Sequence, residues 1–170
     1  MTTPTLPRAE AEERRELMRI WFRMLRLNSR IGAALTQRLR DVGLSVPQFD
    51  CLSTLTEEDG VTQQQLAERL YVTKGNVSGL VNRLVEQGLV KRSLIAGDKR
   101  SYAVSLTAKG RALADRGIAA HQAYVEATLG RMPAGERDLF GNLLVRLREQ
   151  VREEETRLAQ PQAPGPNAFA

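Results

Sequence analysis

The sequence has 170 residues, with 25 Lys and Arg against 20 Asp and Glu, one His, one Cys and a net charge of +5. This length fits one domain, or a small domain with added helices. A single cysteine excludes an internal disulfide and a cysteine-rich zinc site, so a reducing, cytoplasmic location is expected. No apolar run reaches the roughly 18 residues of a membrane span, and no secretory signal follows Met1. Aromatic residues make up 5% of the chain, too few for a platform that stacks on single-stranded bases.

Catalytic and metal-binding motifs are missing from the sequence. No nucleophile has a base to go with it, and the glycine spacings of phosphate-binding loops do not occur. His121 has no Cys, Asp or Glu at the spacing of a metal site. We therefore expect no enzyme activity, no cofactor and no metal.

Positive charge is concentrated in two parts of the chain. Residues 1–40 carry nine Arg and four Glu, and residues 91–111 carry six basic residues and one acidic residue. The parts between and after them, residues 41–90 and 112–170, are net acidic. Clustered basic residues are typical of proteins that bind phosphate groups, and the alternative is a solvated charged surface.

The first predicted element is a long helix over residues 9–41. Its apolar residues recur at helical spacing, at Leu17, Ile20, Trp21, Met24, Ile31, Leu35 and Leu39. Helices of this length in a small domain usually pack against a partner helix or another chain. Gly43 is expected to end the helix.

A second helix is predicted to begin after Ser45. Ser45 and Gln48 have the spacing of a capping box, and Pro47 lies in the first turn. The apolar residues of this helix are Phe49, Leu52 and Leu55.

Two further short helices follow in close succession. Thr62 and Gln65 form a second capping box, and Thr73 caps a helix that Gly88 ends. The buried set predicted for this last helix is Val77, Leu80, Val81, Leu84 and Val85. Two short helices joined by a tight turn indicate a helix-turn-helix.

The hydrophobic period then changes from that of a helix to that of a strand. Residues 89–95 and 101–106 are predicted strands, the second because Tyr102, Val104 and Leu106 alternate with small residues. Residues 96–100 form the predicted hairpin tip. A hairpin directly after a helix-turn-helix predicts a winged helix.

The remainder of the chain is predicted to be helical. A helix begins at Thr107, residues 130–135 break it, and a last helix covers about residues 136–158. Residues 1–8 are expected to be a flexible N-terminus, and residues 159–170, rich in Pro, Ala and Gly, a disordered tail.

The polar face of the helix after Thr73 is the first candidate site. With its apolar residues in the core, the opposite side carries Lys74, Gly75, Asn76, Ser78, Gly79, Asn82 and Arg83. Glycine and serine permit close approach to DNA, and Asn and Arg match adenine and guanine edges in the major groove. The glycines cost helix propensity, which favours this function over an ordinary solvent-exposed face.

The hairpin tip is the second candidate site. Lys99 and Arg100 are placed to reach phosphates or a minor groove. Asp98 lies two residues before Arg100, where its carboxylate can pair with the guanidinium and fix its direction. An ordinary charged turn is the alternative.

Several motifs together resemble a known family. Residues 62–70 read TQQQLAERL, residues 77–92 read VSGLVNRLVEQGLVKR, residues 97–101 read GDKRS and residues 106–110 read LTAKG. On these motifs the chain resembles MarR-family transcriptional regulators over about residues 10–155.

The resemblance implies a mainly α-helical fold with a small antiparallel β wing. A winged helix-turn-helix at residues 45–106 would be flanked by a helical dimerisation region built from residues 9–44 and 107–158. The chain would act as a homodimer on double-stranded DNA, with two recognition helices about one helical turn, or ~34 Å, apart on a pseudo-palindromic operator. Most members of the family are repressors.

The resemblance also assigns residues to DNA binding. Asp98 and Arg100 match an Asp-x-Arg hallmark of the family's wing. The recognition-helix contacts fall by position on Thr73, Asn76, Ser78, Asn82 and Arg83. Charge adds Lys74 and Lys99 to this set.

A small effector is the third expectation, because family members commonly release DNA when a phenolic or anionic molecule binds between the dimerisation helices and the winged domain. Four basic residues recur on one face of the first helix, at Arg19, Arg23, Arg26 and Arg30. With Trp21 placed close to that face, we predict that Trp21, Arg19, Arg23 and Arg26 hold an anionic aromatic effector. A solvated face, or pairing with the acidic residues 153–155 of a second subunit, is the alternative.

Two other functions are weighed against this one. A winged helix can instead bind a protein partner, although such a partner does not require a basic wing, and the salt dependence of binding separates the two. A redox-sensing regulator would use Cys51. Redox-sensing members carry their reactive cysteine in the first helix, whereas Cys51 lies beside Leu52 in the second, so core packing is expected instead.

Overall fold

The structure is a computed structural model that describes residues 8–95 and 98–159, with the backbone alone at residues 8 and 98–101. The chain divides into two compact units, residues 1–124 and 125–170. Among the described residues, no helix combines the length and the hydrophobicity that crossing a bilayer requires.

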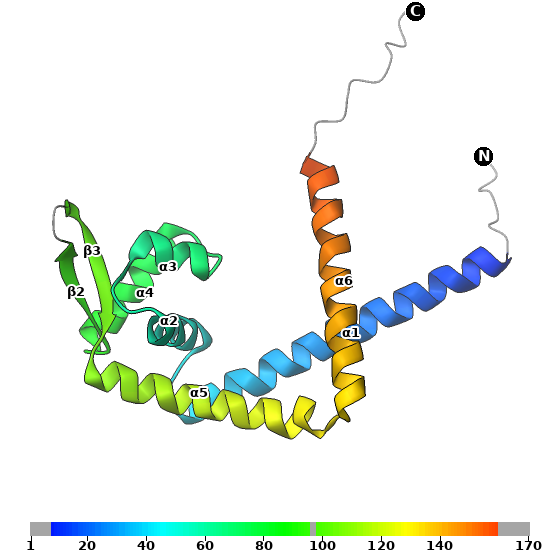
Figure 1. The fold of residues 1–170 in the computed structure, drawn as a ribbon, viewed down its shortest axis with the longest axis horizontal. Helices are drawn as coiled ribbons and strands as arrows, with labels where there is room; N and C mark the ends of the chain where they lie inside the picture. Colours follow the sequence, from blue (N-terminus) through cyan, green and yellow to red (C-terminus); the bar gives the residue numbers. More distant parts are fainter. Residues whose placement is uncertain (1–7, 96–97, 160–170) are drawn as a thin grey trace, which may run out of the picture. The chain divides into compact units, whose positions relative to one another are not determined.

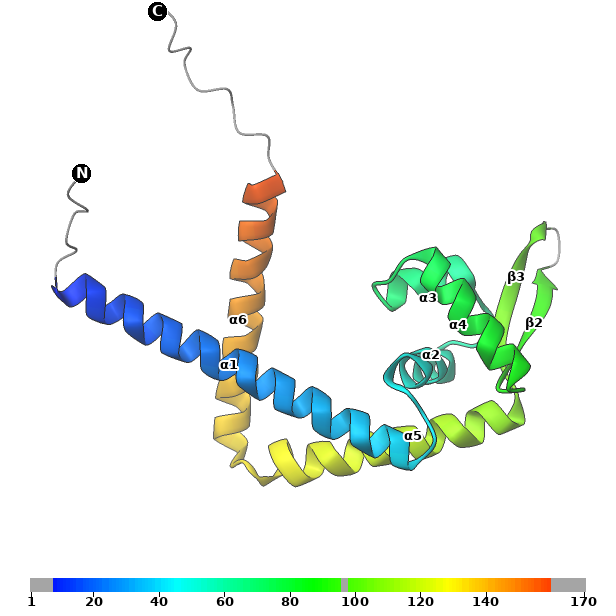
Figure 2. The same cartoon turned by 180° about the vertical axis from the view of Figure 1, so that it is seen from behind.

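Three helices and a β-hairpin form the centre of the first unit. In chain order its elements are α1 (Arg8–Asp41), α2 (Val46–Glu57), β1 (Val61–Thr62), α3 (Gln63–Arg69), α4 (Lys74–Glu86), β2 (Val90–Ile95), β3 (Asp98–Leu106) and α5 (Ala108–Thr128) up to residue 124. Helices α2, α3 and α4 gather beside the strands β2 and β3, which extend away from α5 (Figures 1 and 2). This arrangement confirms the predicted helix-turn-helix and wing.

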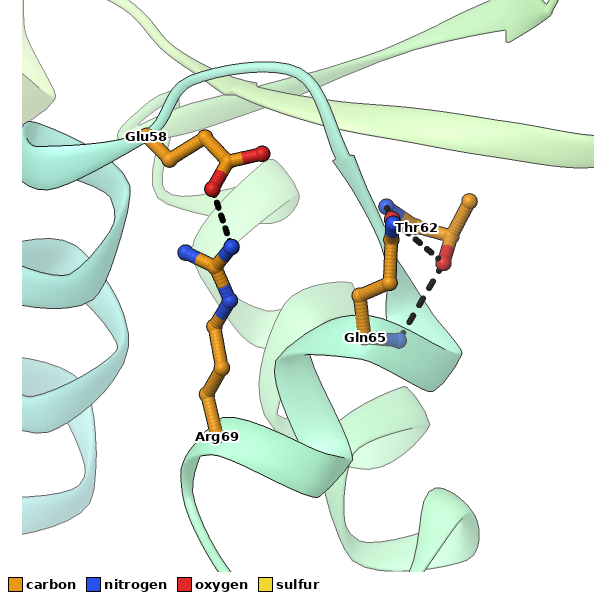
Figure 3. A network of polar contacts seen from close by, with 4 residues as sticks. All are labelled: Glu58, Thr62, Gln65 and Arg69. Atoms are coloured by element: carbon orange, nitrogen blue, oxygen red, sulfur yellow. Dashed lines mark hydrogen bonds and ion pairs between the residues drawn. The ribbon is translucent and has the colours of Figure 1, made fainter.

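The predicted helix caps are present. Ser45 and Gln48 form a complete capping box at α2, and Thr62 and Gln65 form another at α3 (Figure 3). The Thr73 hydroxyl accepts a hydrogen bond from Asn76 N at the start of α4, at 3.3 Å. Each cap satisfies amide groups that a helix start leaves without partners.

The segment between α2 and α3 is held by one ion pair. Arg69, the last residue of α3, pairs with Glu58, which follows α2 (Figure 3). In the turn between α3 and α4, Tyr71 adopts a left-handed φ of 54° with its side chain 95% exposed. This backbone conformation costs a residue with a side chain about 1–2 kcal/mol, so the tight turn is formed against local strain.

The sheet has three antiparallel strands in the order β1-β3-β2. Val61 lies opposite Val104, and Val90 lies opposite Leu106. The two-residue strand β1 was not predicted. Strand β3 begins at Asp98, so the prediction that residues 96–100 are all hairpin tip is wrong at its C-terminal end; residues 96 and 97 lie outside the described residues.

The core of the first unit joins α2, α3 and α4 to the base of the hairpin. Its fully buried side chains are Leu44, Cys51, Leu52, Leu55, Leu66, Val77, Val81, Leu84 and Val104. One predicted inward position is wrong, because Val85 is 37% exposed; Tyr102, whose alternation with small residues predicted the strand, is 47% exposed. Val85 lies at the edge of the apolar stripe of α4, and Tyr102 lies on the part of β3 that pairs with Leu94, itself exposed.

Thr107 and Gly110 attach α5 to the end of α4. The Thr107 hydroxyl donates to the carbonyl of Gly88 (2.7 Å) and accepts from Gly110 N (3.0 Å). Gly110 packs directly on the main chain, because a Cβ atom there would lie 1.9 Å from the carbonyl oxygen of Leu89. The LTAKG motif is therefore a junction in which glycine is required by space.

Helix α1 is continuous, as predicted, and only its C-terminal part packs into the first unit. Leu39 is buried, and the left-handed Gly43 (φ +86°) ends the turn after the helix. The N-terminal part leaves large apolar side chains exposed at Leu17, Met18, Ile20, Trp21, Phe22, Leu25, Leu27 and Ile31. In both views of the ribbon this part of α1 extends away from α2 (Figures 1 and 2).

The second unit contains the end of α5, a 3-10 turn at Leu129–Arg131 and α6 (Ala134–Ala159). The predicted break in the helix is confirmed, and α6 begins two residues earlier than expected. Helix α6 buries none of its residues, and its exposed apolar side chains include Leu139, Leu143, Leu144 and Val151. Like the N-terminal part of α1, this helix exposes a surface that single chains rarely leave to water.

Candidate nucleic-acid interface

Helix α4 presents the polar face that the sequence predicted. Val77, Leu80, Val81 and Leu84 are buried, whereas Lys74, Asn76, Asn82 and Arg83 are exposed and Ser78 is half-buried. Thr73 caps the helix and is exposed as well. The six predicted residues of this segment therefore lie along one helix on its accessible side.

This face is flanked by two hollows. One lies between α4 and α2 and is lined by Gly75, Asn76, Gly79 and Arg83 together with residues of α2. The other lies between α4, α3 and the hairpin and is lined by Gln63, Lys74, Ser78, Asn82, Arg92 and Tyr102, among others. Five of the predicted residues therefore lie in two rows. Asn76 and Arg83 line the first hollow, and Lys74, Ser78 and Asn82, at every fourth position, line the second.

The two glycines of α4 leave its surface open. A methyl group added at Gly75 or Gly79 would meet no atom within 4 Å. Main chain rather than side chain therefore faces the solvent at these positions. A groove of DNA could approach the helix axis closely there, as the sequence predicted.

The guanidinium of Arg92 contacts residues of this face, and the sequence analysis did not assign Arg92 to the site. Arg92 of β2 donates from Nη2 to Asn82 Oδ1 at 2.6 Å. With the Gln63 amide assigned so that its oxygen faces the same guanidinium, that oxygen lies 2.9 Å from Nη2 and 3.1 Å from Nε of Arg92, and the Gln63 amide nitrogen lies 2.8 Å from Ser78 Oγ. This orientation of Gln63 is required because a guanidinium offers only donors. We call Gln63, Ser78, Asn82 and Arg92 the Arg92 cluster.

The structure describes the predicted wing residues only in part. The backbone of Asp98, Lys99 and Arg100 belongs to β3, but their side chains lie outside the described residues. Their DNA contacts therefore stay predictions.

Cys51 is a core residue. Its side chain has no exposed surface, and burial, with a smaller contribution from the Asp50 carboxylate, raises the pKa of its thiol from 9.0 to about 12. A redox sensor needs an accessible thiolate. The burial of Cys51 thus agrees with the predicted core role and disfavours the redox alternative.

We expect Cys51 to resist alkylation in the folded protein. A rise of the pKa to about 12 lowers the thiolate fraction near neutral pH about a thousandfold, and burial blocks access as well. Iodoacetamide at pH 8 should therefore modify the native protein at least about a hundredfold more slowly than the same protein in denaturant. Equal rates in the two conditions would contradict the core assignment.

His121 packs in the first unit rather than standing alone on the surface. Its ring centroid lies 5.5 Å from that of Phe49. Burial raises the pKa of the neighbouring Asp50, and the charge interaction with His121 offsets part of this rise. Within the described residues, no group of three or more His, Cys, Asp and Glu side chains is placed to hold a metal ion.

Part of the predicted effector site forms a groove along α1. Met18 and Phe22 contribute apolar surface, and Arg14, Arg15, Arg19 and Arg26 surround them. All of its lining residues belong to one helix, so this surface by itself does not enclose a ligand. We call this surface the α1 groove.

The placement of Trp21 near the basic face is wrong. Residues two positions apart on a helix point in nearly opposite directions, and Trp21 lies two positions from both Arg19 and Arg23. Neither Trp21 nor Arg23 lines the α1 groove, whereas Phe22 does. Phe22 lies three positions after Arg19 and four before Arg26. This spacing could have placed Phe22 on the same helix face as these arginines.

Comparison with known proteins identifies the family. A sequence model described as the MarR family matches residues 42–101. The HTH-type transcriptional repressor Rv2887 of Mycobacterium tuberculosis is 33% identical over 122 residues, which cover 69% of this chain and 88% of the relative. The chain belongs to the MarR family.

Solved structures of MarR-family proteins have the same fold. The MarR family transcription regulator SP03579 aligns with a TM-score of 0.79 at 21% identity, over 87% of this chain and 98% of that one. Rv2887 in complex with DNA aligns with a TM-score of 0.61 at 28% identity, over 74% and 94% of the two chains. CouR of Rhodococcus jostii RHA1, bound to p-coumaroyl-CoA, aligns with a TM-score of 0.60 at 26% identity, over 85% and 94%.

These findings confirm the predicted family and fold class. This MarR-family protein is a DNA-binding transcriptional regulator with a winged helix-turn-helix.

Proposed function

We propose that this MarR-family protein represses transcription as a homodimer bound to a pseudo-palindromic operator, and that a small effector releases it. The open polar face of α4 is the observation that carries the proposal. Its residues Lys74, Asn76, Ser78, Asn82 and Arg83 supply donors and acceptors for base edges, and Gly75 and Gly79 permit close approach. The wing residues Lys99 and Arg100, aligned by Asp98, would add phosphate contacts.

Dimerisation is supported by the exposed apolar surface of α1 and α6. Leu17 and Ile20 of α1 are 61% and 55% exposed, and Leu139 of α6 is 60% exposed. Burial of this surface against a second copy would contribute about 25 cal/mol per Å² of apolar area. Two copies would then present two α4 helices to two half-sites of the DNA.

The effector proposal rests on the α1 groove. An apolar floor of Met18 and Phe22 beside Arg19 and Arg26 suits an aromatic molecule that carries a carboxylate or phosphate. CouR, a family member, binds p-coumaroyl-CoA, which has both features. In a dimer the second wall of the groove would come from the partner or from another element of the same chain.

Selection from a pool of random DNA duplexes at near-physiological salt tests the proposed function. We expect the retained duplexes to share a pseudo-palindrome with half-sites about one helical turn apart. Binding should weaken steeply as salt rises, because several phosphates are contacted. Asn82→Ala or Ser78→Ala should relax sequence preference without abolishing binding. Retention without an enriched sequence, or binding insensitive to salt, would favour a protein-binding role for the winged helix.

A further inference from the structure

We propose that Arg92 is a positioning residue that determines which base Asn82 reads. This inference rests on the proposed DNA-binding function and concerns the same site. It arises from the Arg92 cluster, in which a side chain of the hairpin fixes side chains of both helices of the helix-turn-helix.

The guanidinium joins three elements at short range. Arg92 lies on β2, its Nη2 donates to Asn82 Oδ1 of α4 at 2.6 Å, and Nη2 and Nε lie 2.9 Å and 3.1 Å from the amide oxygen of Gln63, the first residue of α3. The Gln63 nitrogen in turn lies 2.8 Å from Ser78 Oγ, one turn before Asn82. Movement of the wing is therefore coupled to the orientation of two predicted base-reading residues.

The contacts of Arg92 are with neutral amides. The ion pairs found among the described residues join Arg69 to Glu58 and Arg157 to Glu154, and neither involves Arg92. Hydrogen bonds from a charged donor are stronger than those between neutral groups, so this exposed contact favours one orientation of the Asn82 amide. The positive charge of Arg92 also stays available to a DNA phosphate, because no carboxylate in the described part of the chain neutralises it.

The orientation of Asn82 has a direct consequence for base recognition. An Asn side chain pairs with adenine by accepting from N6 and donating to N7, which uses both its oxygen and its nitrogen. Here Oδ1 accepts one hydrogen bond from Arg92. Its second acceptor site lies beside that cationic donor, which repels the amino group of adenine. The Nδ2 group is left as a donor, which matches a base edge with acceptors, such as N7 and O6 of guanine. Asn82 should therefore select guanine over adenine.

The test compares base preference in wild type and variants by selection from random duplexes. The position read by Asn82 is defined as the one at which Asn82→Ala loses its preference. In wild type we expect guanine to be favoured over adenine there by about tenfold. Arg92→Lys keeps the charge but cannot hold two amides in one plane, so this preference should fall to near unity or change to adenine.

Two controls separate positioning from charge and from folding. Lys91→Met removes a positive charge from the adjacent exposed position of β2 and should weaken binding to all sequences alike, with the guanine preference kept. In an Asn82→Ala background, Arg92→Lys should no longer change that position, because Arg92 acts through Asn82.

The outcomes that overturn the inference are distinct from failure of the proposed function. An Arg92→Lys variant with an unchanged guanine preference, a wild type that prefers adenine at that position, or a lost preference in Lys91→Met would each refute the role of Arg92. If the wild-type protein enriched no sequence at all, the proposed function itself would be wrong, and the inference would fall with it.

Discussion

Replacing Ile20 by glutamate is expected to break the proposed dimer and to lower affinity for the selected operator by at least about a hundredfold. Ile20 is 55% exposed on the N-terminal part of α1, far along the chain from α4, so the residues proposed to bind DNA are themselves unchanged. A carboxylate in an apolar interface costs several kcal/mol, and a symmetric dimer carries the change twice. Loss of the second half-site contact then removes the gain from bivalent binding, which is on the order of 10²–10⁴.

Sedimentation velocity and binding to the selected operator would measure the two effects together. Gln37→Glu is the matched control, because it adds the same charge to the same helix at an exposed position seven residues after Arg30, in line with the arginine stripe and not with the exposed apolar residues. The control should stay dimeric and bind the operator normally. An Ile20→Glu variant that stays dimeric would exclude this face of α1 from the interface.

Replacing Gly110 by alanine is expected to lower the free energy of unfolding by about 3 kcal/mol, the upper part of the range for overpacking. The added Cβ would lie 1.9 Å from the carbonyl oxygen of Leu89 and 2.8 Å from its carbonyl carbon. The same oxygen accepts a hydrogen bond from Thr107 N at 3.0 Å and lies 3.1 Å from Thr107 Oγ1. The main chain therefore cannot move away without losing the junction between α4 and α5.

Urea unfolding at one fixed protein concentration would measure this change, since the stability of a dimer depends on concentration. Gly79→Ala is the control. It lies within α4, and its added methyl group meets no atom within 4 Å. The control should raise stability by up to about 1 kcal/mol, because glycine is a poor helix former. If both variants unfolded at the same urea concentration, Gly110 would have no steric role.

The local signals in the sequence predicted most of the secondary structure correctly. A helix cap depends on residues within four positions of one another, so Ser45, Thr62 and Thr73 identify helix starts without knowledge of the fold. The polar face of α4 was predicted for the same reason, because helical periodicity is a property of a short segment. Trp21 was placed on the wrong face of its helix, although its spacing from Arg19 and Arg23 in the sequence already shows which face it occupies.

Other features required contacts between distant segments. Arg92 lies ten residues from Asn82 and 29 from Gln63, and the role proposed for it follows from side-chain contacts that the fold makes between β2, α3 and α4. Likewise, Gly110 is required only because Leu89 is folded onto it. Neither relation leaves a pattern in the sequence that distinguishes it from an ordinary basic or small residue.

The sequence by itself determined the family, the order of helices and strands, and the polar face of α4, because these depend on residues near one another in the chain. Tertiary structure decided which apolar residues are buried, as Val85 and Tyr102 show, since burial depends on what packs against a side chain. It also decided that Asn82 is held by Arg92. The physical reason is that hydrogen bonds and packing act over a few ångströms in space, whatever the separation along the chain.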